Sequence, residues 1–528
     1  MVLFIYIFKY NECYLNKYCD GSFMNQKSIL GLACWMAFAA QAEMPASVSY
    51  TPTWQARHHL QLLADHAGLP LMVSHWPLPA AAVEQALDKL VLPEQDAESL
   101  KASRDFVRKE LGAARGQGRL QLHLRADSEA LNGYGENYTP GTSGQVWTPE
   151  GRTVLGGVSV AGRLGARAEA SPNSLQSQFS GVGTEGRYQV RPDRSEAVMA
   201  LDGWNFQVFS RQNWWGPGWQ SSLINGHNNP AWLGVGVQRG SVQPSDSEWL
   251  SWMGPWNMDV FVAKAQDPLV VQNQPSGFLF SGMRLTMKPK PWLEVGLSRG
   301  LQTAGAGRPG GLGNFVKSFF GQEVNQSPGD PPDSSNQIAG YDVRVSCPAA
   351  WGACAAYTQW MGEDAAGKVV PLPYRFMKLY GAEMTYADGR YRVFAEYANT
   401  LTTGFQAEGL FPGYINGVYR QGYTQGARWV GSAQGGGSEV TTFGWMDAQQ
   451  QQQLKLHLGR VGLGVGAFAP SVNAPHGRMW GLSASQTLRW QGMTLTPELA
   501  YTHLAQGEDQ TANKRSNLRV GVAMAVPF

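Results

Sequence analysis

The sequence predicts an all-β transmembrane barrel of about eighteen antiparallel strands, preceded by a small N-terminal periplasmic α-helical domain. Three observations lead to this fold class. The last strand alternates and ends on an aromatic residue, the composition is poor in charge, and short turns alternate with long polar connections. Each is typical of a protein that crosses a bacterial outer membrane with strands rather than helices.

The C-terminal segment from Leu518 to Phe528 has a side-chain period of two. Large apolar residues occupy every second position, at Leu518, Val520, Val522, Met524, Val526 and Phe528. Arg, Gly, Ala and Pro lie between them, so an extended strand would have one apolar face and one small or polar face. This pattern fits the closing strand of a transmembrane barrel. Taken alone, the segment also allows an edge strand of a soluble sheet.

Composition agrees with a barrel. Charged residues make up 16% of the 528 residues, below the roughly 25% of soluble proteins, while 63 residues are Gly and 11% are aromatic. The mean hydropathy of −0.28 excludes a bundle of transmembrane helices but not alternating strands. A formal net charge of +2 argues against a nucleic-acid partner bound through its phosphates.

The N-terminal region resembles an export signal. Met24 to Lys27 forms a basic start, an apolar run follows, and Ala40-Gln41-Ala42 fits an A-x-A cleavage site. We therefore expect residues 24–42 to be a signal peptide. Residues 1–23 serve no part of that signal, so we expect them to be a mis-assigned upstream extension.

Two domains are expected in the mature chain. Residues 43–116 show apolar positions at steps of three and four, which predicts helices near Trp54 to Asp65, Ala80 to Leu92 and Asp96 to Leu111. From Gln117 the period changes to two, so residues 117–528 are expected to form the barrel. Gly68 and Pro70 are expected to end the first helix.

Short turns and long connections alternate along residues 117–528. Short turns are expected at Asp202-Gly203, Lys288 to Pro291, Pro348 to Ala353, Asp388-Gly389 and Trp490 to Gly492. Long connections are expected near 130–152, 171–194, 213–230, 305–336 and 404–438. About eighteen strands result, and an even number returns the last strand to the side of the helical domain. The long connections would then be extracellular, and the last strand would pair with the first.

Cys347 and Cys354 are the cysteines that remain after the expected signal peptide. They flank Pro-Ala-Ala-Trp-Gly-Ala, which is expected to form a tight turn, and an oxidising compartment would allow a disulfide between them. Two buried thiols are the alternative. No metal site is expected, because the histidines of the helical region lack the spacing of a zinc motif, and no cofactor is expected either.

Several motifs resemble one family in sequence order. They are Ser74-His-Trp-Pro-Leu78, Asn213-Trp-Trp-Gly-Pro-Gly-Trp-Gln-Ser-Ser-Leu-Ile224, Trp252-Met-Gly-Pro-Trp256, Leu293-Glu-Val-Gly-Leu-Ser-Arg299, Gly307-Arg-Pro309 with Asn314-Phe315, Gly340-Tyr-Asp342 and Gln359-Trp-Met-Gly-Glu-Asp364. The chain from Pro52 to Phe528 thus resembles the Wzi-type capsule assembly proteins of Gram-negative outer membranes. The cysteine pair and the upstream segment depart from that family.

This resemblance implies an eighteen-stranded outer-membrane barrel with a periplasmic helical bundle at its lower mouth. It also implies a surface lectin that binds capsular or extracellular polysaccharide and helps to assemble or retain it. The implied partners are that polysaccharide, outer-membrane lipid and the barrel assembly machinery during biogenesis.

Glycan binding requires aromatic faces for sugar rings and polar groups for hydroxyls and carboxylates. The long connections offer the following candidates: Trp214, Trp215, Trp219, Arg308, Tyr414, Tyr419, Arg420, Tyr423, Arg428 and Trp429. A structural role competes with ligand contact for each of them. In particular, Trp214 to Gly218 could form a folded loop core or a plug, because Gly and Pro there demand a specific backbone.

Two other functions are alternatives to the lectin. The first is a channel for oligosaccharides, which would need an open lumen. The second is a hydrolase that uses Glu363 and Asp364. Neighbouring residues of a strand point to opposite faces, so these two carboxylates would not meet, and we expect no enzymatic activity.

Overall fold

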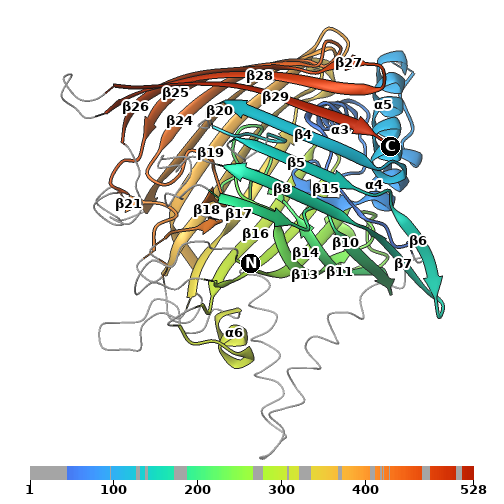
Figure 1. Ribbon diagram of the computed structural model, residues 1–528. Helices are drawn as coiled ribbons and strands as arrows, with labels where there is room; N and C mark the ends of the chain where they lie inside the picture. Colours follow the sequence, from blue (N-terminus) through green and yellow to red (C-terminus); the bar gives the residue numbers. More distant parts are fainter. Residues whose placement is uncertain are drawn as a thin grey trace, which may run out of the picture.

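The computed structural model describes residues 44–94, 97–126, 131–136, 141–171, 187–265, 277–305, 308–319, 335–366, 372–404, 411–416, 419, 421–426, 428–465, 476–506 and 514–528. The expected signal peptide and upstream extension lie outside these residues. A large antiparallel sheet curves into a barrel, and the N-terminal helices gather at one end of it (Figure 1). Helix α6 (Leu312–Phe319) lies at the opposite end.

The N-terminal domain contains the helices α3 (Trp54–His66), α4 (Ala80–Asp88) and α5 (Ala97–Gly116). Helix α3 begins where the Thr53 side chain accepts a hydrogen bond from the Ala56 backbone, and it ends before Gly68, whose φ is +65°. The short strands β1 (Ser49–Tyr50) and β3 (Leu78–Pro79) pair beside them. Leu60, Leu63, Val83 and Leu87 are among the fully buried side chains of its core.

The barrel strands follow one another around a ring. They are β4 (Arg119–Ala126), β5 (Thr142–Trp147) continued by β6 (Gly151–Leu155), β7 (Val158–Arg163) continued by β8 (Gly165–Ser171), β9 (Arg187–Arg191) continued by β10 (Glu196–Leu201), β11 (Trp204–Arg211), β13 (Trp232–Arg239), β14 (Trp256–Lys264), β15 (Leu279–Lys290), β16 (Leu293–Thr303), β17 (Ser335–Ser346), β18 (Cys354–Ala366), β19 (Leu372–Tyr386), β20 (Tyr391–Gly404), β24 (Glu439–Asp447), β25 (Gln452–Val461), β26 (Gly477–Gln486) continued by β27 (Leu488–Trp490), β28 (Met493–Gln506) and β29 (Lys514–Pro527).

The ring closes where the chain ends. Strand β29 pairs antiparallel with β4, with Met524 opposite Leu122, and Gly118 and Phe528 exchange two backbone hydrogen bonds of 3.1 and 3.0 Å. With each interrupted strand counted once, the described residues form eighteen barrel strands, every one paired with both neighbours. Closure leaves no unpaired sheet edge in the ring. The backbone N–H and C=O groups of such an edge could not be solvated by hydrocarbon. The predicted fold class is confirmed.

The closing strand also has the two faces that its sequence predicts. Leu518 is 53% exposed on the outward face, whereas Arg519 is 3% exposed on the inward face. The same alternation holds on the other strands, for example with outward Leu454 and inward Lys455 on β25. Among the described residues, no helix has both the length and the apolar character needed to span a membrane.

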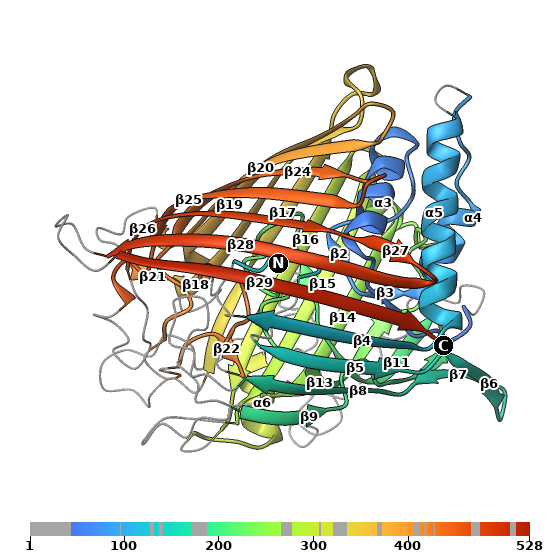
Figure 2. The same cartoon turned by 45° about the horizontal axis from the view of Figure 1, so that its top comes forward.

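All five predicted short turns connect neighbouring strands of the ring. The loop predictions for 130–152 and 171–194 were wrong in part, because β5 lies within the first stretch and β9 within the second. Polar residues such as Thr142, Ser143 and Gln145 hide the strand pattern of β5 in the sequence. Figure 2 shows α3, α4 and α5 together at the end where β29 stops and β4 starts.

Candidate functional site

Two long connections turn back into the barrel. The 212–231 connection joins β11 to β13, and the 411–438 connection joins β20 to β24. Nearly all of their described side chains are buried. Both segments were predicted to be long surface loops, so their burial is a correction to that prediction. The alternative of a folded loop core or plug fits the 212–231 connection better.

The 212–231 connection reaches the helical domain and pairs with it. Strand β12 (Trp214–Trp215) lies antiparallel to β2 (His75–Trp76), with Trp214 opposite Trp76 and Trp215 opposite His75. The Gly216 backbone N–H donates to the Ser74 carbonyl at 2.9 Å. Two motifs that are far apart in the sequence therefore form one small sheet inside the barrel.

Arg57 of α3 lies among aromatic side chains, two from this connection and one, Tyr134, from the segment between β4 and β5. Its guanidinium carbon is 4.3 Å from the ring centroids of Tyr134 and Trp219 and 5.8 Å from that of Trp214. The same group donates to the carbonyls of Pro217 and Gly218 at 2.8 and 2.9 Å. A buried guanidinium that is both stacked and hydrogen-bonded is a strong anchor, because its charge faces electron-rich rings and carbonyl oxygens.

Inward-facing side chains of the barrel hold the other side of the connection. The Glu396 carboxylate accepts backbone hydrogen bonds from Trp219 and Ser221 at 2.8 and 2.6 Å, and Glu383 accepts from the Trp219 indole at 2.5 Å. The Gln359 amide accepts from Leu223 and donates to the Trp215 carbonyl. Gly216, at a φ of +147°, has no room for a side chain, since an added Cβ would lie 2.7 Å from the Gln359 amide.

The 411–438 connection brings three predicted aromatic residues together. The rings of Tyr414 and Tyr423 stack with centroids 5.8 Å apart, and Trp429 lies 5.9 Å from Tyr414. All three side chains have 0% exposure. Tyr414 has a φ of +67°, which is uncommon for a bulky residue. Its hydroxyl donates to the Leu223 carbonyl, and its backbone N–H donates to Glu363.

Arg428 joins the two inserted connections. Its guanidinium donates to the backbone and side-chain oxygens of Asn228 at 2.8 and 3.0 Å. Strands β22 (Thr424–Gln425) and β23 (Arg428–Trp429) form the hairpin that presents it. The Tyr419 hydroxyl donates to the Ala304 carbonyl at 2.9 Å, and its ring packs against Phe278.

The structure therefore brings most of the predicted glycan-binding residues into one buried assembly. The assembly contains Trp214, Trp215, Trp219, Tyr414, Tyr419, Tyr423, Arg428 and Trp429. Arg308 is partly exposed and follows β16 near Ala304, whose carbonyl accepts the Tyr419 hydroxyl. Arg420 lies outside the described residues. In this arrangement the rings of the assembly pack on protein, and contact between any of these residues and sugar stays a prediction.

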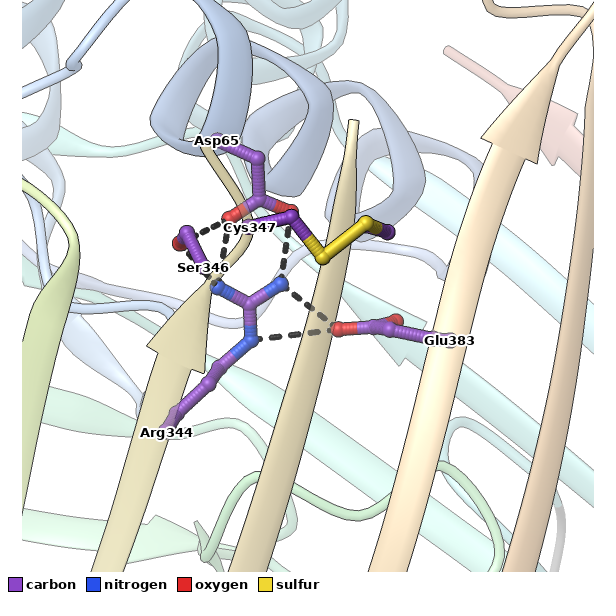
Figure 3. The surroundings of a disulfide bond; sticks show 6 residues. Asp65, Arg344, Ser346, Cys347 and Glu383 are labelled. Carbon is purple, nitrogen blue, oxygen red and sulfur yellow. Dashed lines mark hydrogen bonds and ion pairs between the residues drawn. A yellow bond between two sulfur atoms is a disulfide. The ribbon is translucent and has the colours of Figure 1, made fainter. Parts of the chain in front are cut away.

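Asp65 connects the helical domain to the barrel wall. Its carboxylate accepts from the Arg344 guanidinium at 2.6 and 2.7 Å, and Arg344 also pairs with Glu383 at 2.6 Å (Figure 3). The predicted disulfide between Cys347 and Cys354 is confirmed and lies next to Ser346, which donates to Asp65. The disulfide closes the β17–β18 turn near Asp65 of α3 (Figure 3).

Sequence reasoning missed the residues that hold the inserted connections. Arg57, Tyr134, Gln359, Glu383 and Glu396 were not candidates, although they contact Trp214, Trp215 or Trp219. The sequence signal available for such residues was a charged residue between apolar ones on a barrel strand, as at Glu396. It indicates an inward-facing carboxylate but not its partner.

The lumen is not equally filled on all sides. Inward side chains of β14 to β20 are buried, including Asp259, Arg284 and Gln359. Inward side chains near the helical end of β4 and β28 are partly exposed, including Gln121 and Thr496. Within the part of the chain that the structure describes, no cluster of three or more His, Cys, Asp or Glu side chains could hold a metal ion.

These features define a class of protein: a closed eighteen-stranded β-barrel with its lumen occupied by inserted connections and an N-terminal helical domain at one end. The family model "Capsule assembly protein Wzi" matches residues 112–517, which is most of the chain. The chain belongs to this family.

Two known proteins illustrate the relationship. An uncharacterized 55.8 kDa protein in the cps region of Klebsiella pneumoniae is 28% identical over 344 residues, which cover 62% of this chain and 60% of that relative. The solved structure of Wzi, described as an outer membrane protein involved in group 1 capsule assembly in Escherichia coli and a carbohydrate-binding β-barrel, superimposes with a TM-score of 0.72. The match covers 91% of this chain and 100% of that chain at 21% identity, so it supports the fold alone.

Proposed function

We propose that this protein is an outer-membrane lectin-like barrel that binds capsular or related surface polysaccharide and helps to assemble or retain it at the cell surface. The observation that carries the proposal is a barrel of the capsule assembly family whose lumen is occupied by two connections. One connection pairs with the helical domain, and the other is bonded to the first. A lumen occupied in this way favours binding of a polymer at the end of the barrel over passage of the polymer through the lumen.

The proposed orientation places the helical domain in the periplasm and the opposite barrel end outside the cell. An even number of strands supports it, because both ends of the barrel segment then lie on the side of the helices. Outer-membrane lipid surrounds the outward apolar face, and the barrel assembly machinery inserts the chain. Protease treatment of intact cells tests this orientation. Cleavage in α5 without cell lysis would contradict it.

The glycan is proposed to contact the outer surface of the inserted assembly. The buried rings of Tyr414, Tyr423 and Trp429 then support that surface from beneath, while Arg308 and Arg420 contact carboxylate or hydroxyl groups of the polymer. Many weak contacts along a repeating polymer would give retention through multivalency. An Arg308→Gln variant should weaken binding to immobilised capsular polysaccharide, whereas Arg489→Gln, exposed on β27, should not.

Deletion of the gene in an encapsulated host tests the cellular role. We expect a thinner or disorganised capsule in electron micrographs and more polysaccharide in the culture supernatant. Plasmid-borne wild-type protein should restore retention. Unchanged retention in the deletion strain would contradict the proposal.

Two further measurements separate this function from the alternatives. Single-channel recording in a planar bilayer should show no steady porin-sized conductance, and such a conductance would favour the oligosaccharide channel. We also propose that the protein acts without catalysis. The Glu363 carboxylate accepts the Tyr414 backbone N–H at 2.6 Å, which supports a structural role for it. Polysaccharide cleavage that disappears in a Glu363→Gln variant would contradict this part.

A further inference from the structure

Two arginines face each other across neighbouring strands on the outside of the barrel. Arg460 of β25 is the register partner of Arg478 of β26. Residues directly opposite each other in an antiparallel pair have Cβ atoms about 4.5–5.5 Å apart. Both side chains point outward, because Leu458 and Trp480, two positions away on each strand, are exposed on the same face. Like charges so placed repel each other unless an anion lies between them.

One carboxylate neutralises only part of this charge. Glu439 of β24 pairs with Arg460 at 2.5 Å and also accepts a hydrogen bond from Asn399 at 3.3 Å. Among the residues that the structure describes, Arg478 has no ion pair with an acidic side chain. Arg460 remains 55% exposed in its side chain despite the pair. The site therefore keeps a net positive charge that is open to an anion.

The arginines lie where the outward apolar band ends. Along β25 the outward positions are Leu454, Leu456 and Leu458 before Arg460, and along β26 Leu482 and Trp480 precede Arg478 in the same direction. Beyond both arginines each strand stops at the barrel end opposite the short turns. In a membrane barrel, an aromatic residue followed by a charged one marks the boundary between hydrocarbon and headgroups.

An aromatic surface adjoins the positive site. Trp480 is 40% exposed, and its ring centroid lies 5.1 Å from Tyr501 and 6.0 Å from His503 on β28. Ser516 of β29 fixes this surface through hydrogen bonds with both Tyr501 and His503. An aromatic face beside two guanidinium groups matches a sugar ring that carries a phosphate, since the ring stacks while the phosphate accepts paired N–H donors.

We propose that Arg460, Arg478 and the Trp480 surface bind the headgroup of a phosphorylated glycolipid in the outer leaflet. This inference rests on the proposed outer-membrane location and adds a specific lipid site to it. The phosphate lies between the two guanidinium groups, and Trp480 contacts the adjacent sugar. The site is on the lipid-facing wall, so it is separate from the inserted assembly proposed to support capsule binding.

Native mass spectrometry of the full-length protein in detergent micelles tests the site, with diphosphorylated lipid A as the probe. The wild-type protein should retain the lipid, and the double variant Arg460→Gln/Arg478→Gln should retain about tenfold less, since two charge-assisted contacts are lost. The double Lys variant should retain an intermediate amount, because it keeps the charge but loses the planar fork. Arg489→Gln is the matched control, because Arg489 lies on β27, which continues β26 to the other end of the barrel.

Three outcomes would overturn the proposal. The first is equal lipid retention by the wild-type protein and the double Gln variant. The second is that the wild-type protein retains dephosphorylated lipid A as well as the diphosphorylated form, and the third is displacement of the lipid by inorganic phosphate at an equal phosphate concentration. The last would indicate a site for free anions. A heat-dependent shift in electrophoresis verifies that each variant is a folded barrel, and the single variants replace the double one if it fails. Capsule retention is measured separately, so a failure of the lipid-site proposal can be told apart from a failure of the proposed function.

Discussion

Asp65 of α3 and Arg344 of β17 form a two-pronged ion pair that connects the helical domain to the barrel wall. Both carboxylate oxygens are used, at 2.6 and 2.7 Å, and both side chains are almost fully buried. Glu383 holds Arg344 from the other side at 2.6 Å. The geometry ties α3, at the end of the barrel, to side chains that face the lumen.

We expect an Asp65→Asn substitution to loosen this docking. Removal of one partner leaves the buried Arg344 charge compensated by Glu383 alone, which should cost about 2–4 kcal/mol. Limited proteolysis should then cleave the helical domain faster, while the heat-dependent electrophoretic shift of the barrel persists. Asp88→Asn is the matched control, because its pair with Arg108 is exposed at 60% and 40% in the two side chains. Equal protease resistance of the Asp65 variant and the wild-type protein would refute the proposed role of the pair.

A second prediction concerns Arg57. An Arg57→Met variant keeps much of the side-chain volume but removes the charge above Tyr134 and Trp219 and the donors to Pro217 and Gly218. We expect the 212–231 connection to loosen, with a cost of about 2–3 kcal/mol from the unpaired carbonyls and the lost stacking. Tryptophan fluorescence should shift to longer wavelength as Trp214 and Trp219 gain water.

The exposed Arg108 provides the control for this substitution. Arg108→Met in the same domain should leave the fluorescence unchanged, because Arg108 contacts Asp88 and the Leu87 carbonyl at the surface. A spectrum of the Arg57 variant identical to that of the wild-type protein would show that the connection is held without this anchor.

The barrel itself could be predicted from local pattern, because alternation is a property of each strand alone. The strand from Leu518 to Phe528 shows why, because its apolar and polar residues alternate. An even number of strands then predicts that this strand pairs with the one that begins after Gln117. The disulfide was equally local, since Cys347 and Cys354 flank a single turn. These features need no knowledge of distant partners.

The inserted assembly could not be predicted in the same way. Trp214 and Trp215 have the composition of an exposed binding loop, and only their pairing with His75 and Trp76 makes them a buried strand. That pairing joins segments about 140 residues apart and depends on the barrel that surrounds both. Arg57 was missed for the same reason, because nothing in α3 indicates which rings its guanidinium will meet.

The third prediction is a modest stabilisation by the disulfide. The bond closes a loop with a sequence separation of 7, which limits its effect on the entropy of the unfolded chain to about 2–3 kcal/mol. The β17–β18 pairing already fixes the turn, through the Cys347 N–H that donates to the Cys354 carbonyl. A Cys347→Ser/Cys354→Ser variant should therefore still form the barrel but unfold at lower denaturant concentration. A variant with an unchanged denaturation midpoint would contradict this expectation.

The fourth prediction is a loss of stability of the helical domain in acid, centred on His59. Burial, with a smaller contribution from the positive charge of Arg392, lowers the pKa of His59 to about 4. Its ring contacts Ser103 at 3.0 Å and Phe106 of α5 with centroids 4.5 Å apart, so it lies between α3 and α5. The neutral ring is thus the form that fits this interface.

The sign of the effect follows from linkage. An unfolded His59 binds a proton below about pH 6.5, whereas the folded one resists protonation until about pH 4. The stabilisation is therefore complete above pH 6.5 and is lost as the pH falls from there through 4. A His59→Asn variant cannot titrate, so it should lose about 1–2 kcal/mol less than the wild-type protein over this range, a value reduced because the ring is partly exposed. Urea-induced loss of helical circular dichroism at a series of pH values measures this, with the exposed His476→Asn as control. The same acid sensitivity in the His59 variant and the wild-type protein would assign the effect to other buried groups of the interface.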